Sequence, residues 1–388
     1  MSDIRDNNFE QCMKCTICNE YCPVAKATGL FPGPKQAGPD GERYRMLDPE
    51  YYNDALKYCL NCKRCEVACP SDVRIADYIL RARLRYGRRS HVIRNTVLSR
   101  TDLMGTLGTA FSPVANLAAG MMFKGGPRYA RRTFETLYRK EIARSQEAFP
   151  LKVSYFHGCY VNYNYPELGM DLIKILNALG IGVRLLEHEQ CCGIALISNG
   201  FVKRADKQAN NNIEQIEKAV RGGGKVLTTG STCTFTIRDE YREILSIDNS
   251  SVRDSVEMAV KFIYEFITDN GVKLSFKPDY KMKVAYHTAC HMAKLGWSFY
   301  SIELLKMIPG VELTVLEQQC CGVAGTYGFK KENRHISDSI GEPLFHRLKQ
   351  LAPDVVATDC ETCKWQIEMH TGLAVANPVS ILAGALKI

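Results

Sequence analysis

The chain has 388 residues, of which 46% are hydrophobic and 17 are cysteines. This length allows two to three domains, and this hydrophobic content is enough to bury their cores. The formal net charge is +8, but residues 81–144 hold 14 Lys or Arg against three acids, so the rest of the chain is slightly acidic. The basic segment lacks interleaved base-stacking aromatics in a recognised fold, which argues against a nucleic-acid-binding protein.

Two cysteine runs of the form C-x-x-C-x-x-C-x-x-x-C-P open the chain. They consist of Cys12, Cys15, Cys18 and Cys22, and of Cys59, Cys62, Cys65 and Cys69. This spacing is typical of two-cluster ferredoxins, in which the fourth cysteine of each run binds the other cluster. It predicts one 4Fe-4S cluster on Cys12, Cys15, Cys18 and Cys69, and a second 4Fe-4S cluster on Cys59, Cys62, Cys65 and Cys22.

Disulfides and structural zinc are the alternatives for these eight cysteines. No secretory signal is evident, so we expect a reducing cytosol, where thiols serve metals or catalysis. Structural zinc usually takes paired C-x-x-C knuckles rather than four closely spaced cysteines that end in Cys-Pro. We therefore expect an N-terminal α-helical two-cluster ferredoxin domain over residues 1–80.

Residues 81–150 are expected to form a basic helical linker. Its uncharged stretch Leu103–Phe123 has 21 residues, long enough to span a bilayer, but its Gly, Thr, Ser and Asn make it only weakly apolar. A hairpin broken near Pro113 fits better, lying on the membrane surface with Arg88, Arg89, Arg131 and Arg132 near anionic head groups. A hairpin packed on this protein or on another protein of a complex is the alternative.

The remaining nine cysteines form an internal repeat. The first copy contains Cys159, Cys191, Cys192 and Cys233, and the second copy contains Cys290, Cys320, Cys321, Cys360 and Cys363. In each copy, apolar strands such as 183–186 and 311–316 alternate with stretches of helical period. This pattern predicts two small parallel α/β domains, over residues 151–250 and 251–388, with the cysteine loops at the carboxyl ends of strands.

Nine cysteines at matched spacing indicate metal sites, because ordinary buried cysteines would not repeat in this way. Gly193 and Gly322 follow the adjacent pairs and let the backbone turn so that both thiolates reach one metal. The first copy has Gly230 where the second has Cys360. Its four cysteines suffice for one cubane or one zinc, whereas the five of the second copy suit an unusual cluster better. His188, His287 and His291 lie beside these cysteines. They could support the metal ligands or relay protons, but we expect ordinary hydrogen-bonded loop histidines, which are more common.

The duplicated Cys-Cys-Gly pattern resembles a family of iron-sulfur proteins that act in oxidoreductase complexes. This family includes the B and D components of heterodisulfide reductase, iron-sulfur components of glycolate and lactate oxidases, and the C component of anaerobic glycerol-3-phosphate dehydrogenase. The stretches at 11–23 and 31–39, together with the order of domains, are most similar to the last group. The resemblance implies an α+β multidomain chain with a noncubane 4Fe-4S centre in the five-cysteine copy. In the first copy it allows a 4Fe-4S centre or zinc.

No G-x-G-x-x-G follows a strand and no Walker sequence is present, so the chain has no evident flavin or nicotinamide site. We therefore expect no catalytic residue here, and we expect a flavoprotein dehydrogenase partner. With the resemblance, this implies a peripheral protein on the cytoplasmic face of the inner membrane. It would pass electrons from sn-glycerol 3-phosphate oxidation through 4Fe-4S clusters to a membrane quinone. An iron-sulfur component of a glycolate or lactate oxidase and a catalytic protein like heterodisulfide reductase stay open as alternatives.

Overall fold

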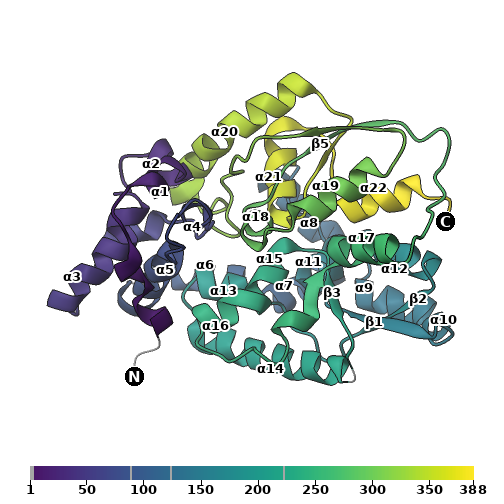
Figure 1. The fold of residues 1–388 in the computed structure, drawn as a ribbon, viewed down its shortest axis with the longest axis horizontal. Helices are drawn as coiled ribbons and strands as arrows, with labels where there is room; N and C mark the ends of the chain where they lie inside the picture. The colour runs from purple at the N-terminus through teal and green to yellow at the C-terminus, as the bar shows by residue number, and fades with distance from the viewer. Residues whose placement is uncertain (1–3, 88–89, 123–124, 222) are drawn as a thin grey trace.

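The computed structural model describes residues 4–87, 90–122, 125–221 and 223–388. The chain forms an N-terminal group of short helices, a helical linker, and two α/β units that each contain one parallel sheet (Figure 1). The N-terminal helices lie at one end of the molecule, and the C-terminus lies at the other. This arrangement confirms the expected α+β multidomain fold class.

The N-terminal region carries its cysteines in loops between short helices. Its helical elements are η1 (Ile4–Gln11), α1 (Ile17–Glu20), α2 (Pro23–Ala27), η2 (Gln36–Asp40), α3 (Gly41–Leu47), η3 (Asp54–Tyr58), α4 (Arg64–Val67) and α5 (Ile75–Tyr86). Lys14 and Thr16 in the first cysteine run match Asn61 and Lys63 in the second, and all four have φ between 55° and 64°. Left-handed backbone is uncommon for residues other than glycine. The two cysteine loops are therefore conformational copies of each other.

The linker is mainly helical. Its elements are α6 (Val92–Ser99), α7 (Thr101–Ala110), α8 (Ser112–Met122), α9 (Phe134–Leu137), η4 (Tyr138–Ile142) and α10 (Ala143–Gln146). The break between α7 and α8 falls at Phe111, two residues before Pro113 and thus near the expected position. Pro113 lies in the first turn of α8, where a missing backbone N–H has no helical partner to lose. Of the residues expected near a membrane, Arg88, Arg89 and Phe123 lie outside the described part of the chain.

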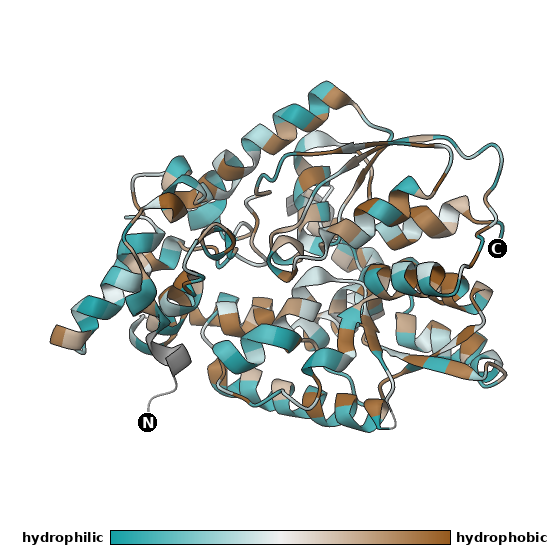
Figure 2. Cartoon of the chain, viewed as in Figure 1, coloured by the Kyte–Doolittle hydropathy of each residue, from teal (hydrophilic) through white to brown (hydrophobic). Residues whose placement is uncertain are grey.

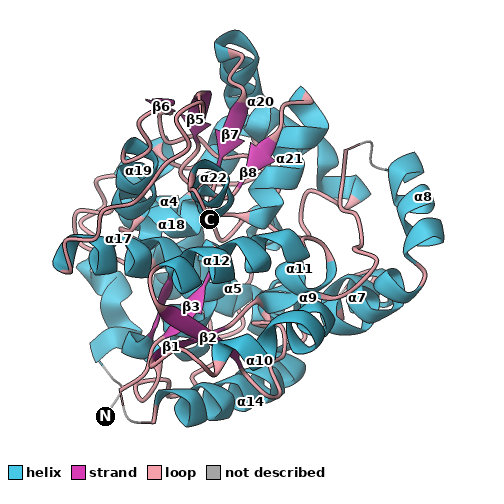
Figure 3. Ribbon diagram, turned by 90° about the vertical axis from the view of Figure 1, so that its right-hand side faces the viewer, coloured by secondary structure: helices cyan, strands magenta, loops and turns pink. Residues whose placement is uncertain are grey.

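One side of α7 packs on the protein, and α8 stands away from it. A Cβ atom on Gly105 or Gly108 would overlap the ring of Tyr163 or Tyr129, so glycine permits this close packing. Figure 3 shows α8 at the edge of the molecule, separate from both sheets. Among the described residues, no helix combines the length and the apolar character needed to cross a bilayer.

The first α/β unit has the strand order β2-β1-β3-β4, and every pair is parallel. Its elements are β1 (Leu151–Tyr155), α11 (Gly158–Tyr163), α12 (Pro166–Ala178), β2 (Ile181–Leu185), α13 (Ile194–Ser198), α14 (Val202–Val220), β3 (Val226–Thr228), α15 (Ser231–Phe235), η5 (Thr236–Glu240), α16 (Tyr241–Glu243), η6 (Arg253–Ser255), β4 (Val256–Met258) and α17 (Ala259–Asp269). The sheet takes β4 from beyond residue 250, where the second unit was expected to begin.

The second unit repeats this topology with the order β6-β5-β7-β8, again all parallel. Its elements are β5 (Met282–Tyr286), α18 (Cys290–Leu295), α19 (Ser298–Lys306), β6 (Val311–Val315), η7 (Lys331–Asn333), α20 (Arg334–Leu351), β7 (Val355–Ala357), α21 (Glu361–Thr371), β8 (Val375–Ala376) and α22 (Pro378–Ala385). In both units the cysteines lie just beyond the carboxyl ends of the first three strands along the chain.

A single hydrophobic core joins the two units. Leu168, Leu172 and Ile175 of α12 are almost fully buried, as their helical spacing predicts, and α12 packs against α22 of the second unit. Likewise, α17 packs against α19. The strands of both sheets are largely hydrophobic in Figure 2. The shared core holds the two units together, so their cysteine loops keep a fixed relation to each other.

Candidate metal centres

The N-terminal cysteines gather in two groups. Burial, together with nearby Cys12, Cys69 and Cys15, raises the pKa of the Cys18 thiol to about 11. A separate small cavity is lined by four cysteines, namely Cys22, Cys59, Cys62 and Cys65. The structure thus brings together the same two groups of four that the crossed spacing predicts. Their assignment as ligands stays a prediction.

Backbone N–H groups point at several of these sulfur atoms. Ala25 donates to Cys22 Sγ at 3.4 Å, Val73 donates to Cys69 Sγ at 3.4 Å, and Asn61 donates to Cys59 Sγ at 3.5 Å. Hydrogen bonds of this kind favour anionic sulfur over the neutral thiol. Clustered thiols with such donors, on loops that turn around them, fit iron-sulfur clusters.

The first Cys-Cys-Gly site comprises Cys159, Cys191, Cys192 and Cys233. Cys191 Sγ lies 3.7 Å from Cys159 Sγ, and the thiols of Cys191 and Cys233 adjoin the Cys192 thiol and raise its pKa. Gly193 has φ of 89°, the left-handed conformation that the turn after the pair requires. The four thiols therefore form one group, although they follow three different strands.

Asp102 also belongs to the surroundings of this site, which the sequence did not suggest. Its Oδ2 atom accepts a hydrogen bond from the backbone N–H of Cys191 at 3.1 Å. Burial, together with the charge of Cys191, raises the pKa of the Asp102 carboxyl to about 7. Asp102 lies at the start of α7, so this hydrogen bond ties the linker hairpin to the first site. The only sequence signal was an isolated acid in a basic segment.

The second Cys-Cys-Gly site contains five cysteines, four of which form two close pairs. Cys321 Sγ lies 3.1 Å from Cys363 Sγ, and Cys290 Sγ lies 3.9 Å from Cys320 Sγ. A hydrogen bond from Cys363 lowers the pKa of Cys360 to about 6. All five cysteines are buried or partly buried, and all line the same cavity.

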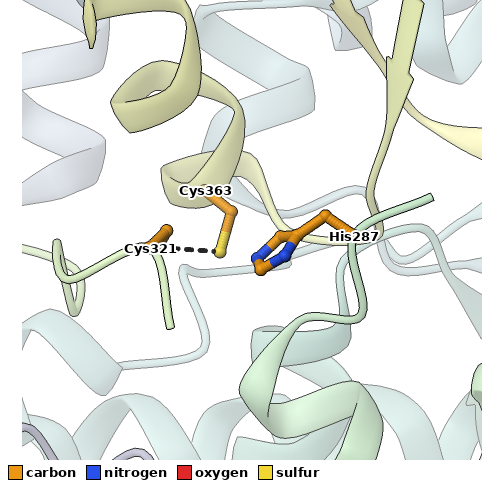
Figure 4. A group of neighbouring side chains, drawn as sticks. All are labelled: His287, Cys321 and Cys363. Carbon is orange, nitrogen blue, oxygen red and sulfur yellow. Dashed lines mark hydrogen bonds between the residues drawn. The ribbon is translucent and has the colours of Figure 1, made fainter. Parts of the chain in front are cut away.

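His287 points at this second site (Figure 4). A ring nitrogen and the sulfur atoms of Cys321 and Cys363 all lie within 4.8 Å of one another. The side chain is fully buried, and neither ring nitrogen has a hydrogen-bond partner among the described residues. The expectation of an ordinary hydrogen-bonded loop histidine is therefore wrong for His287. Burial lowers its pKa to about 4, so the imidazole is neutral and has a nitrogen lone pair available.

The N-terminal region and the second site meet directly. The thiol of Cys290 adjoins that of Cys62 and is the main cause that lowers the pKa of Cys62 to about 7. Around this contact α4 packs on α18, and Lys294 of α18 pairs with Glu66 of α4 at 3.1 Å. Cys62 and Cys290 are 228 residues apart, so no local pattern in the sequence could have shown that they adjoin.

A buried lysine holds the N-terminal region against the first α/β unit. The side chain of Lys63 has no exposed surface and contacts three carboxylates, those of Asp77, Glu66 at 3.9 Å and Glu240 at 4.0 Å. Asn61 donates to Glu240 at 2.6 Å. Burial alone would lower the pKa of Lys63, but the nearby acids outweigh burial and raise this pKa, so the lysine stays charged. One cation therefore compensates carboxylates from both sides of the junction.

Three of the cysteine groups share one large cavity of about 1050 Å³. Its lining includes Cys59 and Cys62 of the N-terminal region and all nine cysteines of the two Cys-Cys-Gly sites. Residues of the linker hairpin, among them Met104 and Ala118, line it as well. The cavity therefore connects the cysteine side chains with the α7 and α8 helices.

Models of known domains match parts of this chain, and a known protein matches it over nearly its full length. A 4Fe-4S dicluster domain model matches residues 8–73, and a cysteine-rich domain model with the Cys-Cys-Gly motif matches residues 153–238 and 284–368. The C subunit of the anaerobic glycerol-3-phosphate dehydrogenase of Escherichia coli (strain K12) is 52% identical over 398 residues, covering 99% of this chain and 100% of that protein.

Two archaeal proteins are more distant relatives. The D subunit of a dihydromethanophenazine:CoB–CoM heterodisulfide reductase of Methanosarcina barkeri is 26% identical over 424 residues, covering 98% of this chain and 94% of that protein. The B subunit of a fumarate reductase (CoM/CoB) of Methanothermobacter marburgensis is 26% identical over 369 residues, covering 92% of this chain and 67% of that protein. Their similarity extends across the ferredoxin-type and Cys-Cys-Gly regions together.

These matches agree with the grouped thiols and confirm the resemblance inferred from the cysteine motifs. The chain carries iron-sulfur clusters and has an electron-transfer role, as its dicluster domain indicates. It belongs to the family of anaerobic glycerol-3-phosphate dehydrogenase C subunits.

Proposed function

We propose that the chain transfers electrons from a flavoprotein partner that oxidises sn-glycerol 3-phosphate to a membrane quinone. The observation that carries this proposal is the packing of α4 on α18, because it places Cys62 and Cys290 in one cavity and so joins the ferredoxin region to the second Cys-Cys-Gly site. A chain whose metal sites adjoin in this way can move electrons without a flavin of its own. The substrate comes from the similarity to the Escherichia coli dehydrogenase.

The proposed ligand sets follow the observed groups of thiols. Cys12, Cys15, Cys18 and Cys69 hold one cubane, and Cys22, Cys59, Cys62 and Cys65 hold the other. The five cysteines of the second Cys-Cys-Gly site hold a further 4Fe-4S centre, and the four of the first site hold a 4Fe-4S centre or zinc. Bound clusters supply one-electron carriers, and the surrounding backbone donors and buried side chains set their potentials.

The function is tested with the assembled complex. We expect the chain to copurify with a flavoprotein and to support quinone reduction driven by sn-glycerol 3-phosphate. Glycolate and lactate, offered at the same concentrations, should give only the background rate. Reduction driven by either hydroxy acid, with no response to sn-glycerol 3-phosphate, would assign the chain to an oxidase of the other class.

The α7 and α8 helices are the proposed membrane contact. They expose a continuous set of large apolar side chains, between 45% and 81% accessible, namely Leu103, Leu107, Phe111, Val114, Leu117 and Met121. The exposed Arg131 and Arg132 follow in the chain. An apolar helical face with nearby cations is typical of a helix that lies in the head-group region. The cavity reaches these same helices, which supports quinone access beside the metal sites.

Replacing Val114 and Leu117 with Glu is expected to abolish cosedimentation with anionic vesicles, because charged side chains oppose insertion of this face. Leu47→Glu is the matched control, since Leu47 is 87% exposed on α3 in the ferredoxin region. It should leave vesicle binding unchanged. Equal binding by both variants would assign the α7 and α8 face to a protein partner instead.

His287→Phe tests whether the imidazole acts on the second Cys-Cys-Gly site. Phe156 occupies the corresponding position after β1 in the first unit, so the fold accommodates the ring. Loss of the nitrogen should shift the potential and the EPR signal of the second site while the ferredoxin signals stay unchanged, because groups beside the ligands tune a cluster. Phe156→Leu serves as a packing control. An unchanged EPR titration in His287→Phe would leave the histidine without an electronic role.

A further inference from the structure

Glu361 crosses from the second α/β unit to the first Cys-Cys-Gly site. It begins α21 directly after Cys360. A Cβ atom placed on Gly230 would overlap the Glu361 carboxylate, with the carboxyl carbon only 3.0 Å away and the nearer oxygen closer still. The carboxylate of the second unit therefore occupies the space that a side chain at residue 230 would need.

Residue 230 is the position at which the first site lacks its cysteine. Gly230 precedes α15 and Cys233 in the same way that Cys360 precedes α21 and Cys363. The backbone angles are also similar, with φ −111° and ψ 118° at Gly230 and φ −135° and ψ 121° at Cys360. Any residue can adopt this extended conformation. Backbone geometry thus does not require glycine here, whereas the position of Glu361 does.

The contact between the two units at this point is held by the main chain. The N–H of Ser231 donates to the carbonyl of Asp359 at 2.9 Å. Next to it, Thr232 Oγ1 lies 3.9 Å from Cys360 Sγ. Asp359 is itself fixed by Tyr286 at 2.7 Å and Ser301 at 2.9 Å. The carboxylate of Glu361 is therefore brought to the first site by a braced loop.

The carboxylate of Glu361 is left without a partner: among the described residues it makes no ion pair and no hydrogen bond to another residue. It lines the same cavity as Cys159, Cys191 and Cys233. An unpartnered carboxylate on the wall of this cavity has oxygen atoms available to a metal ion.

We propose that Glu361 is an oxygen ligand of the metal centre held by Cys159, Cys191, Cys192 and Cys233. The inference rests on the proposed function, since it requires a metal centre at the first site. Iron accepts carboxylate oxygen beside thiolate sulfur, and an iron-sulfur centre with five ligands takes both, whereas the four cysteines alone would fill a zinc site. The first site then has four sulfur ligands and one oxygen ligand, and the second has five sulfur ligands. This difference gives two otherwise similar units different metal centres.

The test compares the full-length chain with Glu361→Gln by anaerobic iron, zinc and sulfide analysis and by EPR and Mössbauer spectroscopy. We expect Glu361→Gln to lose the metal or the spectroscopic component of the first site and to keep those of the other sites. Glu368→Gln is the matched control, because Glu368 lies on the same helix and pairs with Lys364 at 2.5 Å. Wild-type metal content and spectra in Glu361→Gln would overturn the inference.

Two further variants separate this inference from a folding defect and from the proposed function. Gly230→Cys with Glu361→Ala returns the fifth cysteine to the first site, so it should restore metal content with an all-sulfur spectrum. Failure of this double variant to restore the metal would count against the inference. Cys191→Ser should remove the first-site metal in any case. If it does so while Glu361→Gln has no effect, only the Glu361 inference fails; if neither changes the metal content, the first site holds no metal.

Discussion

Replacing Cys65 with Ser is expected to remove about four irons per chain, the content of one 4Fe-4S cluster, and to reduce quinone reduction to background. Cys65 is buried, and it lines the small cavity together with Cys22, Cys59 and Cys62. This group of thiols adjoins the second Cys-Cys-Gly site through Cys62. Loss of its cluster therefore interrupts electron transfer from the ferredoxin region to that site. Quinone reduction and iron content are measured on the same anaerobic preparation.

The same variant should leave the partner flavoprotein active. Reduction of a soluble dye by the complex should continue at the wild-type rate, because the dye takes electrons before they enter this chain. Tyr58→Ser is a control for local disturbance, since Tyr58 lies beside the cysteine run and is partly exposed. Wild-type quinone reduction by Cys65→Ser would show that electrons do not pass through this group of cysteines.

Lys63→Met should destabilise the junction of the ferredoxin region by about 3–5 kcal/mol, the usual effect of removing one partner of a buried ion pair. Asp77, Glu66 and Glu240 would be left buried without their shared cation. Anaerobic urea unfolding of the full chain, followed by the visible absorbance of the clusters, measures this loss as a lower midpoint.

Two comparisons make the Lys63 result specific. Lys26→Met removes an exposed lysine of the same region, whose ion pair to Glu20 spans 3.8 Å, and should change stability by less than about 0.5 kcal/mol. Glu240→Gln combined with Lys63→Met should recover part of the lost stability, because one uncompensated charge is removed. Equal midpoints for Lys63→Met and Lys26→Met would contradict a structural role for the buried network.

Local patterns in the sequence predicted the parts of the fold that depend on local chemistry. The spacing of Cys12 to Cys22 and of Cys59 to Cys69 is a property of single loops, and the repeated strand and helix pattern indicated the two parallel units. The fourth strands were not predicted. β4 has three residues and β8 has two, too short for a period to be visible.

Long-range partners could not be predicted from the sequence. Asp102 meets Cys191 across 89 positions, and Lys63 contacts the carboxylate of Glu240 in η5. Glu361 resembles an ordinary helix-starting acid until the fold places it against Gly230. Each of these contacts depends on how separate units pack, which local propensity and spacing do not encode.

The central claim is that the second Cys-Cys-Gly site holds a cluster that continues the path from the ferredoxin region. Anaerobic iron, zinc and sulfide analysis with EPR, on the full chain and on the Cys360→Ser, Cys363→Ser double variant, tests it most directly. About 12 or more irons per chain, with one EPR signal lost in the double variant, is the result we expect. About eight irons with zinc, and identical EPR signals in both proteins, would contradict the claim and confine electron transfer to the ferredoxin region.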